Sequence, residues 1–254
     1  GIIYYNKGEY GKAIEYYTKN LKIREKIGDK KGIAGALNNI GTIYRDQGDL
    51  AKSIDYYTRS IKISEELGDK QGVATSLNNI GIVYDDQENY TKSIEYHTRS
   101  LKIREKIGDK YAITISLSNI GNIYLLKRDL DKAINYFTRS LKIKEEMGDE
   151  NGIAISLFNM GNIYKKQGNY SKALDYCTKS LKIYRDIGNN YGITISLTNI
   201  GIIYFKEGNY EKALEKTTES LSIAQEIGNV ENIKDASNSL WLINKKLGKH
   251  KQAL

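Results

Sequence analysis

Residues 39–44 read Asn-Ile-Gly-Thr-Ile-Tyr, and closely related hexapeptides begin at fixed intervals of 40 residues along the chain. The same pattern starts at Asn79, Asn119 and Asn199, and the variant Asn-Met-Gly-Asn-Ile-Tyr starts at Asn159. A constant period of this length is the signature of a repeat array. One such unit cannot bury its apolar face alone, whereas stacked units share a continuous core and leave a long surface open to a partner. The sequence therefore predicts an elongated array.

Each unit is predicted to contain two helices. Within residues 29–46, apolar residues recur at spacings of three and four, which places them on one helical face: Ile33, Leu37, Ile40 and Tyr44. A second helix is expected over residues 50–67, with a buried face formed by Leu50, Ser53, Ile54, Tyr57 and Ile61. Asp29 can cap the first helix, and Gly68 can end the second in a left-handed conformation. Because the chain contains no proline, every segment can be helical, and we expect an all-α solenoid of tandem antiparallel helix hairpins.

A glycine recurs inside the first helix of each unit, although glycine there costs roughly 1 kcal/mol relative to alanine. These glycines are Gly41, Gly81, Gly121, Gly161 and Gly201. Small residues recur on the second helix at Ala13, Ser53, Ser93, Ala133, Ala173 and Ala213. We expect the two sets to face each other, so that the helix backbones approach closely. A recurring tyrosine should then fill the wider end of the wedge between the helices, at Tyr44, Tyr84, Tyr124, Tyr164 and Tyr204.

The stretch Leu37-Asn38-Asn39-Ile40-Gly41-Thr42-Ile43-Tyr44, followed by Gly48-Asp49-Leu50 and Ser53-Ile54, resembles the tetratricopeptide repeat. That family has a usual period of about 34 residues, and its second helix commonly ends at a proline. The period of 40 without proline is similar to the longer repeats of kinesin light chain, of the spindle-orientation adaptor Pins/LGN and of bacterial arrays fused to signalling outputs. The resemblance implies a right-handed superhelix whose first helices line a concave groove.

The repeat boundaries predict one solenoid domain over residues 1–254. Its units are 1–28 (partial), 29–68, 69–108, 109–148, 149–188, 189–228 and 229–254. In the last unit Trp241 replaces the glycine, and a tryptophan cannot allow the same close approach, so we expect a capping segment. Gly1 begins inside a first helix, which would leave the second helix of that unit partly uncovered. Self-association through exposed repeat ends is therefore a further alternative.

The formal charge of +8 permits binding to nucleic acid or to anionic surfaces. Much of the excess, however, comes from lysines that recur beside carboxylates such as Glu25 and Glu65, an arrangement explained by pairs on a solvated helix face. These lysines are Lys22, Lys62, Lys102, Lys142 and Lys182. Nucleic acid is therefore an unfavoured partner. No apolar run approaches the roughly 20 residues that a membrane-spanning helix needs, so we expect a cytoplasmic protein that does not enter a membrane.

The chain offers no set of residues suited to catalysis or metal binding. Cys177 and His97 occupy the same register as Tyr17, Tyr57 and Phe137, which indicates a core position, and His250 lies near the end. No cluster with metal-ligand spacing accompanies either histidine, and no phosphate-binding glycine loop follows a strand. We therefore expect no metal, no cofactor and no enzymatic activity, and we predict a protein-interaction scaffold.

The resemblance implies that the registers of Gly35, Asn38, Asn39, Thr42, Arg45 and Asp46 face the groove. Early units place polar side chains there: Arg45, Asp46, Asn78, Asp85 and Asp86. Middle units place Ile115, Asn122, Leu125, Leu126, Ile155, Phe158 and Asn162, and late units place Ile195, Phe205, Lys165, Lys166, Lys206, Lys245 and Lys246. We predict a peptide ligand with an apolar centre and an acidic portion toward the late units. The alternative is that the lysines only solubilise helix ends, where cations also favour the carbonyl dipoles.

An asparagine recurs in every complete unit, at Asn39, Asn79, Asn119, Asn159 and Asn199. An amide carries both a donor and an acceptor, so it can hold the main chain of a ligand, and related peptide-binding arrays use this position in that way. A structural role is equally open, in which each amide bonds the neighbouring helix. A second function also stays open, namely a regulatory sensor segment of a larger signalling protein.

Overall fold

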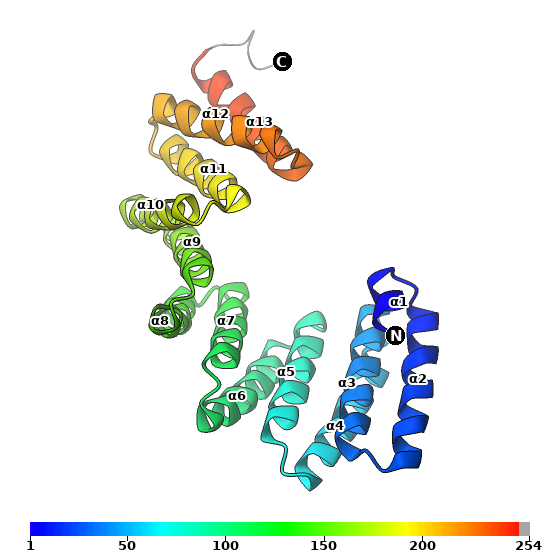
Figure 1. The fold of residues 1–254 in the computed structure, drawn as a ribbon. Coiled ribbons are helices and arrows are strands. Elements are labelled where there is room, and N and C mark those ends of the chain that lie inside the picture. Colours follow the sequence, from blue (N-terminus) through cyan, green and yellow to red (C-terminus); the bar gives the residue numbers. More distant parts are fainter. Residues whose placement is uncertain (249–254) are drawn as a thin grey trace. The chain divides into compact units, whose positions relative to one another are not determined.

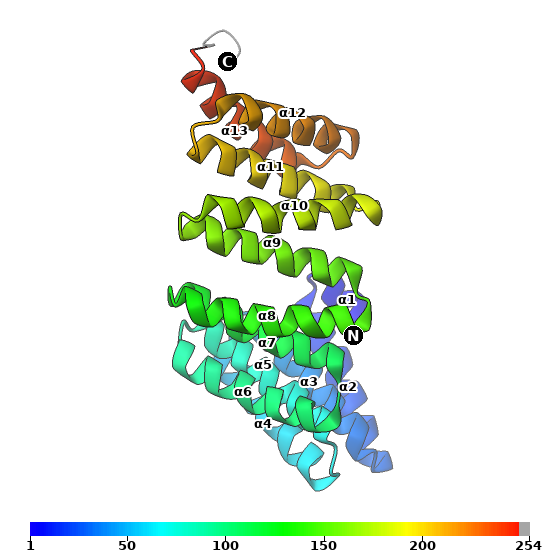
Figure 2. The same ribbon diagram turned by 90° about the vertical axis from the view of Figure 1, so that its left-hand side faces the viewer.

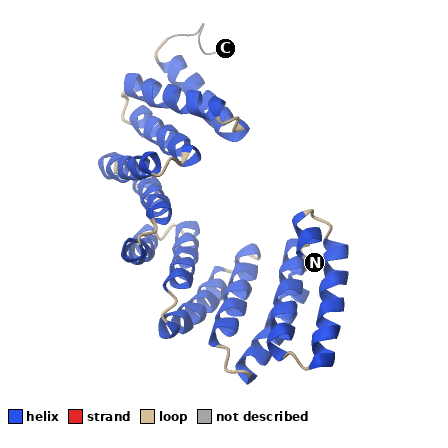
Figure 3. Cartoon of the chain, viewed as in Figure 1, coloured by secondary structure: helices blue, strands red, loops and turns tan. Residues whose placement is uncertain are grey.

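The computed structural model describes residues 1–248, and this part of the chain contains thirteen helices and no strand (Figure 3). In chain order the helices are α1 Ile2–Asn6, α2 Tyr10–Ile27, α3 Lys30–Asp46, α4 Leu50–Glu66, α5 Lys70–Asp86, α6 Tyr90–Ile107, α7 Lys110–Leu126, α8 Leu130–Met147, α9 Glu150–Lys166, α10 Tyr170–Asp186, α11 Asn190–Lys206, α12 Tyr210–Glu226 and α13 Val230–Lys246. The predicted first and second helices are confirmed to within about one residue. No helix of the described residues is long and apolar enough to cross a membrane.

The chain forms two compact units, which are described separately. The first unit, Gly1–Tyr136, contains α1 to α7 and the start of α8, and the second unit begins at Phe137 (Figure 1). Within the first unit α3 packs on α4, and α5 packs on α6. Within the second unit α9 packs on α10, and α11 packs on α12, so that these helices stack in chain order (Figure 2). Tandem helical hairpins are therefore present in both units, as the repeat predicts.

Each hairpin begins and ends at the residues that the sequence indicates. The Asp29 carboxylate accepts a hydrogen bond from the Gly32 N–H at 2.8 Å, and equivalent caps recur along the chain. Gly28 and Gly68 end the preceding helices with φ of 70° and 66°, a left-handed conformation that glycine adopts without steric cost. The helices are therefore joined by short turns, in most of which a glycine ends one helix and a capping aspartate or asparagine begins the next.

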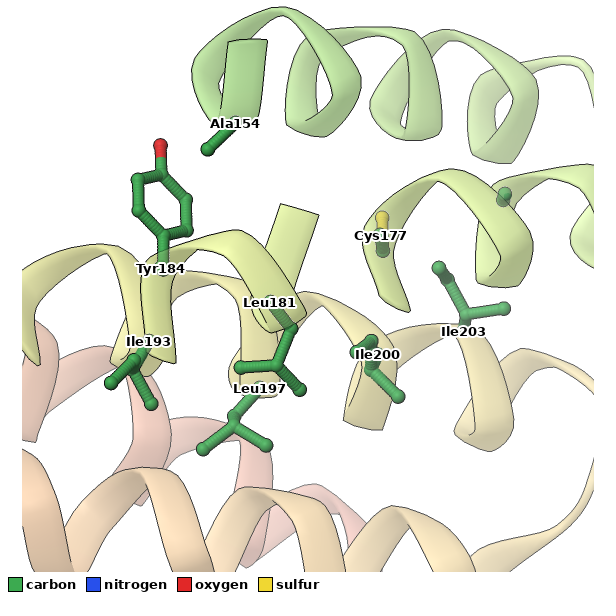
Figure 4. Packing of buried hydrophobic residues seen from close by; sticks show 9 residues of the cluster. Ala154, Cys177, Leu181, Tyr184, Ile193, Leu197, Ile200 and Ile203 are labelled. Carbon is green, nitrogen blue, oxygen red and sulfur yellow. The ribbon is translucent and has the colours of Figure 1, made fainter. Parts of the chain in front are cut away.

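The apolar stripe of the first helix forms the core between neighbouring helices. In the second unit, residues of α10 and α11 pack together with Ala154 of α9 (Figure 4). The main members of this cluster are Cys177, Leu181, Tyr184, Ile193, Leu197, Ile200 and Ile203. This cluster therefore joins the α9–α10 hairpin to the following helix α11.

The recurring glycines lie where the hairpin helices touch. A Cβ at Gly161 or Gly201 would overlap a second-helix side chain and lie 3.3 Å from the carbonyl oxygen of Ala173 or Ala213. At Gly41 the same atom would lie 2.9 Å from the ring of Tyr57. The predicted close approach is thus confirmed. In the first unit the glycine makes room for an aromatic ring rather than for a backbone.

Two further ladders bind the hairpins together. A buried serine of at least four second helices donates to a carbonyl of the first helix of the same hairpin, for example at 2.9 Å from Ser60 to Ala34 and 2.8 Å from Ser180 to Ala154. The recurring tyrosines lie half-buried, and four of them stack on a second-helix tyrosine with ring centroids 5.3–5.5 Å apart. These pairs are Tyr44–Tyr56, Tyr84–Tyr96, Tyr124–Tyr136 and Tyr164–Tyr176.

The last described helix, α13, packs against both α11 and α12. The first helices of earlier hairpins make equivalent contacts, so the capping role of this segment stays a prediction. Trp241 is 43% exposed, so its ring lies at the surface instead of between helices, and Lys245 Nζ lies 5.1 Å from the ring centroid. The predicted position of His250 lies outside the described residues.

Candidate functional site

The first helices of successive hairpins form one continuous face in each unit. In the first unit α3 contacts α5, and in the second unit α11 contacts both α9 and α13. The second helices pack on first helices to complete each hairpin. We call the surface formed by α3, α5 and α7 the inner face of the first unit, and the surface formed by α9, α11 and α13 the inner face of the second unit.

Charges on the inner face of the first unit pair with one another. The Arg45 guanidinium lies 2.7 Å from the Asp46 carboxylate and 3.9 Å from that of Asp86. Tyr5 donates a hydrogen bond to Asp46 at 2.5 Å, and this bond raises the pKa of Tyr5 to about 12. Asp85 approaches the buried His97, with Oδ2 lying 3.3 Å from Nε2. These contacts leave little unpaired charge on this part of the surface.

The inner face of the second unit combines an apolar hollow with a lysine that lacks a carboxylate partner. The hollow has a volume of about 210 Å³ and is lined by Phe158, Ile195, Thr198, Asn199, Ile202, Asn232 and Asp235. Lys165 Nζ donates to the neutral amide of Asn199, and burial lowers the pKa of Lys165. Within residues 1–248 no carboxylate oxygen lies within 4 Å of this ammonium group. Lys166 and Lys206 are exposed, so the arrangement suits an anionic group from outside the chain.

The recurring asparagine occupies a different environment in each unit. Asn39 is exposed, whereas Asn199 is 4% exposed and donates to Cys177 Sγ at 3.2 Å. Asn79 donates to Asn38 Oδ1 at 2.8 Å, which is a bond to the preceding first helix. Asn119 and Asn159 are half-buried. The structural role, in which the amide bonds a neighbouring helix, therefore applies at Asn79 and Asn199.

Asn78, predicted as a groove residue, lies in the interior of the first unit. It is 6% exposed, and its Oδ1 accepts from Asn119 Nδ2 at 3.2 Å. The same oxygen lies 3.1 Å from Nδ1 of His97. The side chain of Asn78 therefore joins helices α5, α6 and α7, and a ligand on the surface would meet its neighbours first.

The other predicted site residues are distributed between the two inner faces. Asn122 is exposed on α7, and Leu125 is half-buried on the same helix. Phe158, Asn162 and Lys165 are half-buried on α9. Phe158, Asn199 and Lys165 are brought together in the second unit, whereas Asn122 and Leu125 belong to the first.

The sequence interpretation missed a polar hollow in the first unit. This hollow has a volume of about 380 Å³ and is lined by Lys31, Ala34, Gly35, Asn38, Asn39, Ser60, Ser64, Asp69, Gln71, Gly72 and Thr75. The signal was present, because Ser64 is a short residue at a register that four other units fill with Arg24, Arg104, Lys144 or Tyr184, while the last hairpin has Ala224 there. No group of His, Cys, Asp and Glu side chains suited to a metal ion occurs in the described part of the chain.

Comparison with sequence families identifies the repeat. The family model described as tetratricopeptide repeat matches residues 1–66, 32–106, 72–146, 111–186 and 152–226. A search of curated protein sequences gives no significant match.

Comparison with solved structures gives neighbours of the same fold. BtubC (BKLC) from P. vanneervenii has a TM-score of 0.78 at 16% identity, and the match covers 87% of this chain and 92% of that one. A signal transduction ATPase with a tetratricopeptide repeat sensor from Pyrococcus horikoshii has a TM-score of 0.82 at 23% identity, over 98% of this chain and 40% of that one. Tetratricopeptide-like repeats of a kinesin light chain from Podospora anserina have a TM-score of 0.64 at 12% identity, over 76% and 95% of the two chains.

Proposed function

Because this chain belongs to the tetratricopeptide repeat family, we propose that it is a protein-interaction scaffold whose inner faces bind a peptide or a segment of a partner protein. The observation that carries the proposal is the inner face of the second unit. There a hollow with apolar walls from Phe158, Ile195 and Ile202 and a polar remainder adjoins Lys165, a lysine without a carboxylate partner in the described residues. The ligand is a segment with an apolar residue followed by acidic residues, which Lys165, Lys166 and Lys206 attract.

Catalysis has no part in this proposal. Recognition of an extended or helical segment requires side-chain pockets and polar groups for its main chain, and both inner faces offer these. Of the recurring asparagines, Asn39 and Asn159 have amides without a hydrogen-bond partner in the described residues, and the proposed contacts to the ligand come from these two, supported by Asn122 and Asn162. Asn79, Asn119 and Asn199 are already engaged in bonds within the fold. Phe158 and Leu125 supply apolar contacts.

A binding experiment with a charge-reversal variant tests the proposal. The probe is a fluorescent peptide with a leucine followed by two glutamates, and the comparison peptide carries two lysines instead. The triple variant Lys165→Glu, Lys166→Glu and Lys206→Glu should weaken binding of the acidic probe by at least about tenfold, since each lost charge contact contributes about 1 kcal/mol. The control is Lys102→Glu, Lys142→Glu and Lys182→Glu, which changes the net charge equally at exposed positions of second helices. Equal affinity of the two triple variants would disprove the proposal.

The asparagines can be assigned by a matched pair of variants. Asn119 donates to Asn78, whereas Asn159 has no hydrogen-bond partner within residues 1–248. Asn159→Ala should therefore lower affinity for the acidic probe without changing the melting temperature. Asn119→Ala should lower the melting temperature. If Asn159→Ala changes neither quantity, the ligand role of this register is wrong.

A sensor role is a second candidate. The solved structure from P. horikoshii is described as carrying a tetratricopeptide repeat sensor, and this chain covers 40% of that protein. A sensor must change shape when its ligand binds, whereas a passive scaffold need not. Small-angle scattering with and without saturating probe peptide separates the two, because an unchanged profile would favour the scaffold.

A further inference from the structure

At five joints a first helix packs against the preceding second helix, and one residue of the second helix lies at the register of a small residue eight positions later; the α12–α13 joint differs and has Ala224 and Asn232 at these registers. We call the residue of the second helix the joint residue. The pairs are Arg24 with Gly32, Ser64 with Gly72, Arg104 with Ala112, Lys144 with Gly152, and Tyr184 with Gly192. Because the backbone around the joint repeats, these five sites allow a direct comparison within one chain.

Three of the five joint residues are cations, and two of them, Arg104 and Lys144, donate to the equivalent pair of acceptors on the following helix. Arg104 Nη1 donates to the carbonyl of Ala112 and to the hydroxyl of Ser116, both at 2.8 Å. Lys144 Nζ donates to the hydroxyl of Ser156 at 3.0 Å and to the Gly152 carbonyl at 3.4 Å. The joint is therefore a site that accepts a guanidinium or an ammonium group.

Arg24 shows a further acceptor at this site. Its Nη1 donates to Oδ2 of Asp29, the carboxylate that caps the following helix. The other oxygen of Asp29 accepts from the Gly32 N–H at 2.8 Å. A cap carboxylate can thus hold the helix terminus with one oxygen and a joint cation with the other.

The joint between α4 and α5 keeps the cap carboxylate but has no cation. Asp69 Oδ1 accepts from the Gly72 N–H at 3.0 Å, and Asp69 Oδ2 has no hydrogen-bond or ion-pair partner in the described part of the chain. Ser64 is 1% exposed, and its hydroxyl also lacks a partner there. A buried hydroxyl without a partner is unfavourable, so this site is polar and unsatisfied.

The space that a longer joint residue would fill is open. The hollow of about 380 Å³ has Ser60 and Ser64 of α4 as its buried floor. Its rim includes Lys31, Gly35 and Asn39, which are exposed on α3. The hollow therefore opens on the inner face of the first unit, where a bound segment would lie. Its volume is in the range that holds one large side chain.

We propose that this hollow binds the guanidinium group of an arginine side chain of the partner, a proposal that rests on the proposed binding function of the inner faces. The guanidinium donates to Asp69 Oδ2 and to the Ser64 hydroxyl and takes the place that Arg104 fills in the next hairpin. A planar group with five donors can reach acceptors on both helices at once, whereas an ammonium group is a single point of charge. Lys31 at the rim opposes the bound cation, so its removal strengthens binding.

Calorimetric titration of the full chain with N-acetyl-arginine amide tests the site. The control ligand is N-acetyl-citrulline amide, which has the same shape without the charge. We expect the arginine compound to bind at least tenfold more tightly than the citrulline compound. Lys31→Gln should tighten arginine binding about threefold. Equal affinity of the two compounds would overturn the proposal.

Two variants locate the binding. Ser64→Arg places the protein's own guanidinium in the hollow and should abolish binding, and circular dichroism verifies its fold. Asp69→Asn keeps a side chain that caps α5, since asparagine is an equally good cap, and should weaken binding at least tenfold. Arginine binding that survives in both variants would show that the compound binds elsewhere.

The arginine site and the lysine cluster can fail separately because they lie in different units. The variant with Lys165, Lys166 and Lys206 changed to glutamate should bind N-acetyl-arginine amide with unchanged affinity. Loss of acidic-peptide binding with retained arginine binding confirms both sites. If the acidic peptide does not depend on those lysines but arginine still binds at Ser64, only the proposed role of the second unit is wrong.

Discussion

The joint between α4 and α5 and the joint between α10 and α11 occupy the same register but are packed differently. Tyr184 is 2% exposed and packs over Gly192 within a continuous apolar cluster (Figure 4). At Ser64 the corresponding space is a polar hollow. An identical period therefore does not give every hairpin the same contact with its neighbour. Stability is concentrated where the joint is filled, and the unfilled joint leaves polar groups available to a ligand.

The helix caps differ between the two units in a similar way. In the first unit the caps are mostly aspartates, at Asp29, Asp49, Asp69, Asp109 and Asp129. In the second unit they are mostly asparagines, at Asn169, Asn189, Asn209 and Asn229. Both residue types accept the same backbone hydrogen bond, but only the aspartate can be protonated. The two units should therefore respond differently to acid.

The largest loss of stability is expected when the joint between α10 and α11 is given the serine found at the joint between α4 and α5. Tyr184→Ser removes a buried aromatic ring and should lower the free energy of unfolding by about 3–5 kcal/mol, as for other large-to-small core changes. Urea unfolding followed by circular dichroism measures the loss. The matched variant Ser64→Ala should not lower the free energy of unfolding, because the hydroxyl has no partner to lose and its burial is unfavourable. Similar losses in the two variants would contradict the comparison.

A smaller loss is expected when a cationic joint is emptied. Arg104→Ser removes hydrogen bonds to the Ala112 carbonyl and the Ser116 hydroxyl, together with the packing of the aliphatic stem. We expect the free energy of unfolding to fall by about 1–3 kcal/mol. The same urea titration provides the measurement, and a loss above that of Tyr184→Ser would reverse the predicted order.

Acidification should weaken the first unit before the second. A backbone hydrogen bond from Gly32 lowers the pKa of Asp29, one from Ala112 lowers that of Asp109, and Lys52 lowers that of Asp49. A carboxylate with a lowered folded pKa stabilises the fold above the ordinary Asp pKa of about 3.9, and this contribution is lost as the pH falls through the lowered value. Hydrogen exchange at pH 7 and near pH 3, corrected for the intrinsic rate, should show more loss of protection in α3 and α7 than in α11. Equal loss of protection in both units would disprove the role of the aspartate caps in acid sensitivity.

The smallest effect should come from exchanging one cap type for the other. Asp109→Asn should change stability at pH 7 by less than about 0.5 kcal/mol, since both residues are good caps. It should nevertheless reduce the acid sensitivity of α7. The reverse exchange, Asn189→Asp, should make α11 more sensitive to acid. Melting temperatures at pH 7 and pH 3 compare the two variants, and an unchanged pH dependence in both would exclude the caps as the cause.

Much of the fold could be predicted because it depends on residues that recur in every unit. Leu37, Ile40 and Gly41 are determined by a helix-to-helix contact that is the same wherever the motif appears, so periodicity alone indicated their burial.

The candidate site could be predicted less well because it depends on neighbours in space that differ between units. Asn39 and Asn199 share one register, yet the first is exposed and the second is buried against Cys177 and Lys165. The hollow at Ser64 exists because one side chain is short while the surrounding backbone is unchanged. Comparing the joint residues of successive hairpins in the sequence would have indicated this position. Only the structure shows that the Ser64 hydroxyl and Asp69 Oδ2 have no partner in the described residues.

Cys177, the sole cysteine of the sequence, allows the second unit to be probed with thiol-modifying reagents. Its side chain is fully buried, and burial raises the pKa of the thiol to about 11, so the folded protein should react with thiol reagents only when α10 and α11 separate. The rate of modification therefore measures local opening of this one region without any engineered label. A ligand that binds the second unit would slow the reaction, whereas arginine bound at Ser64 would leave the rate unchanged.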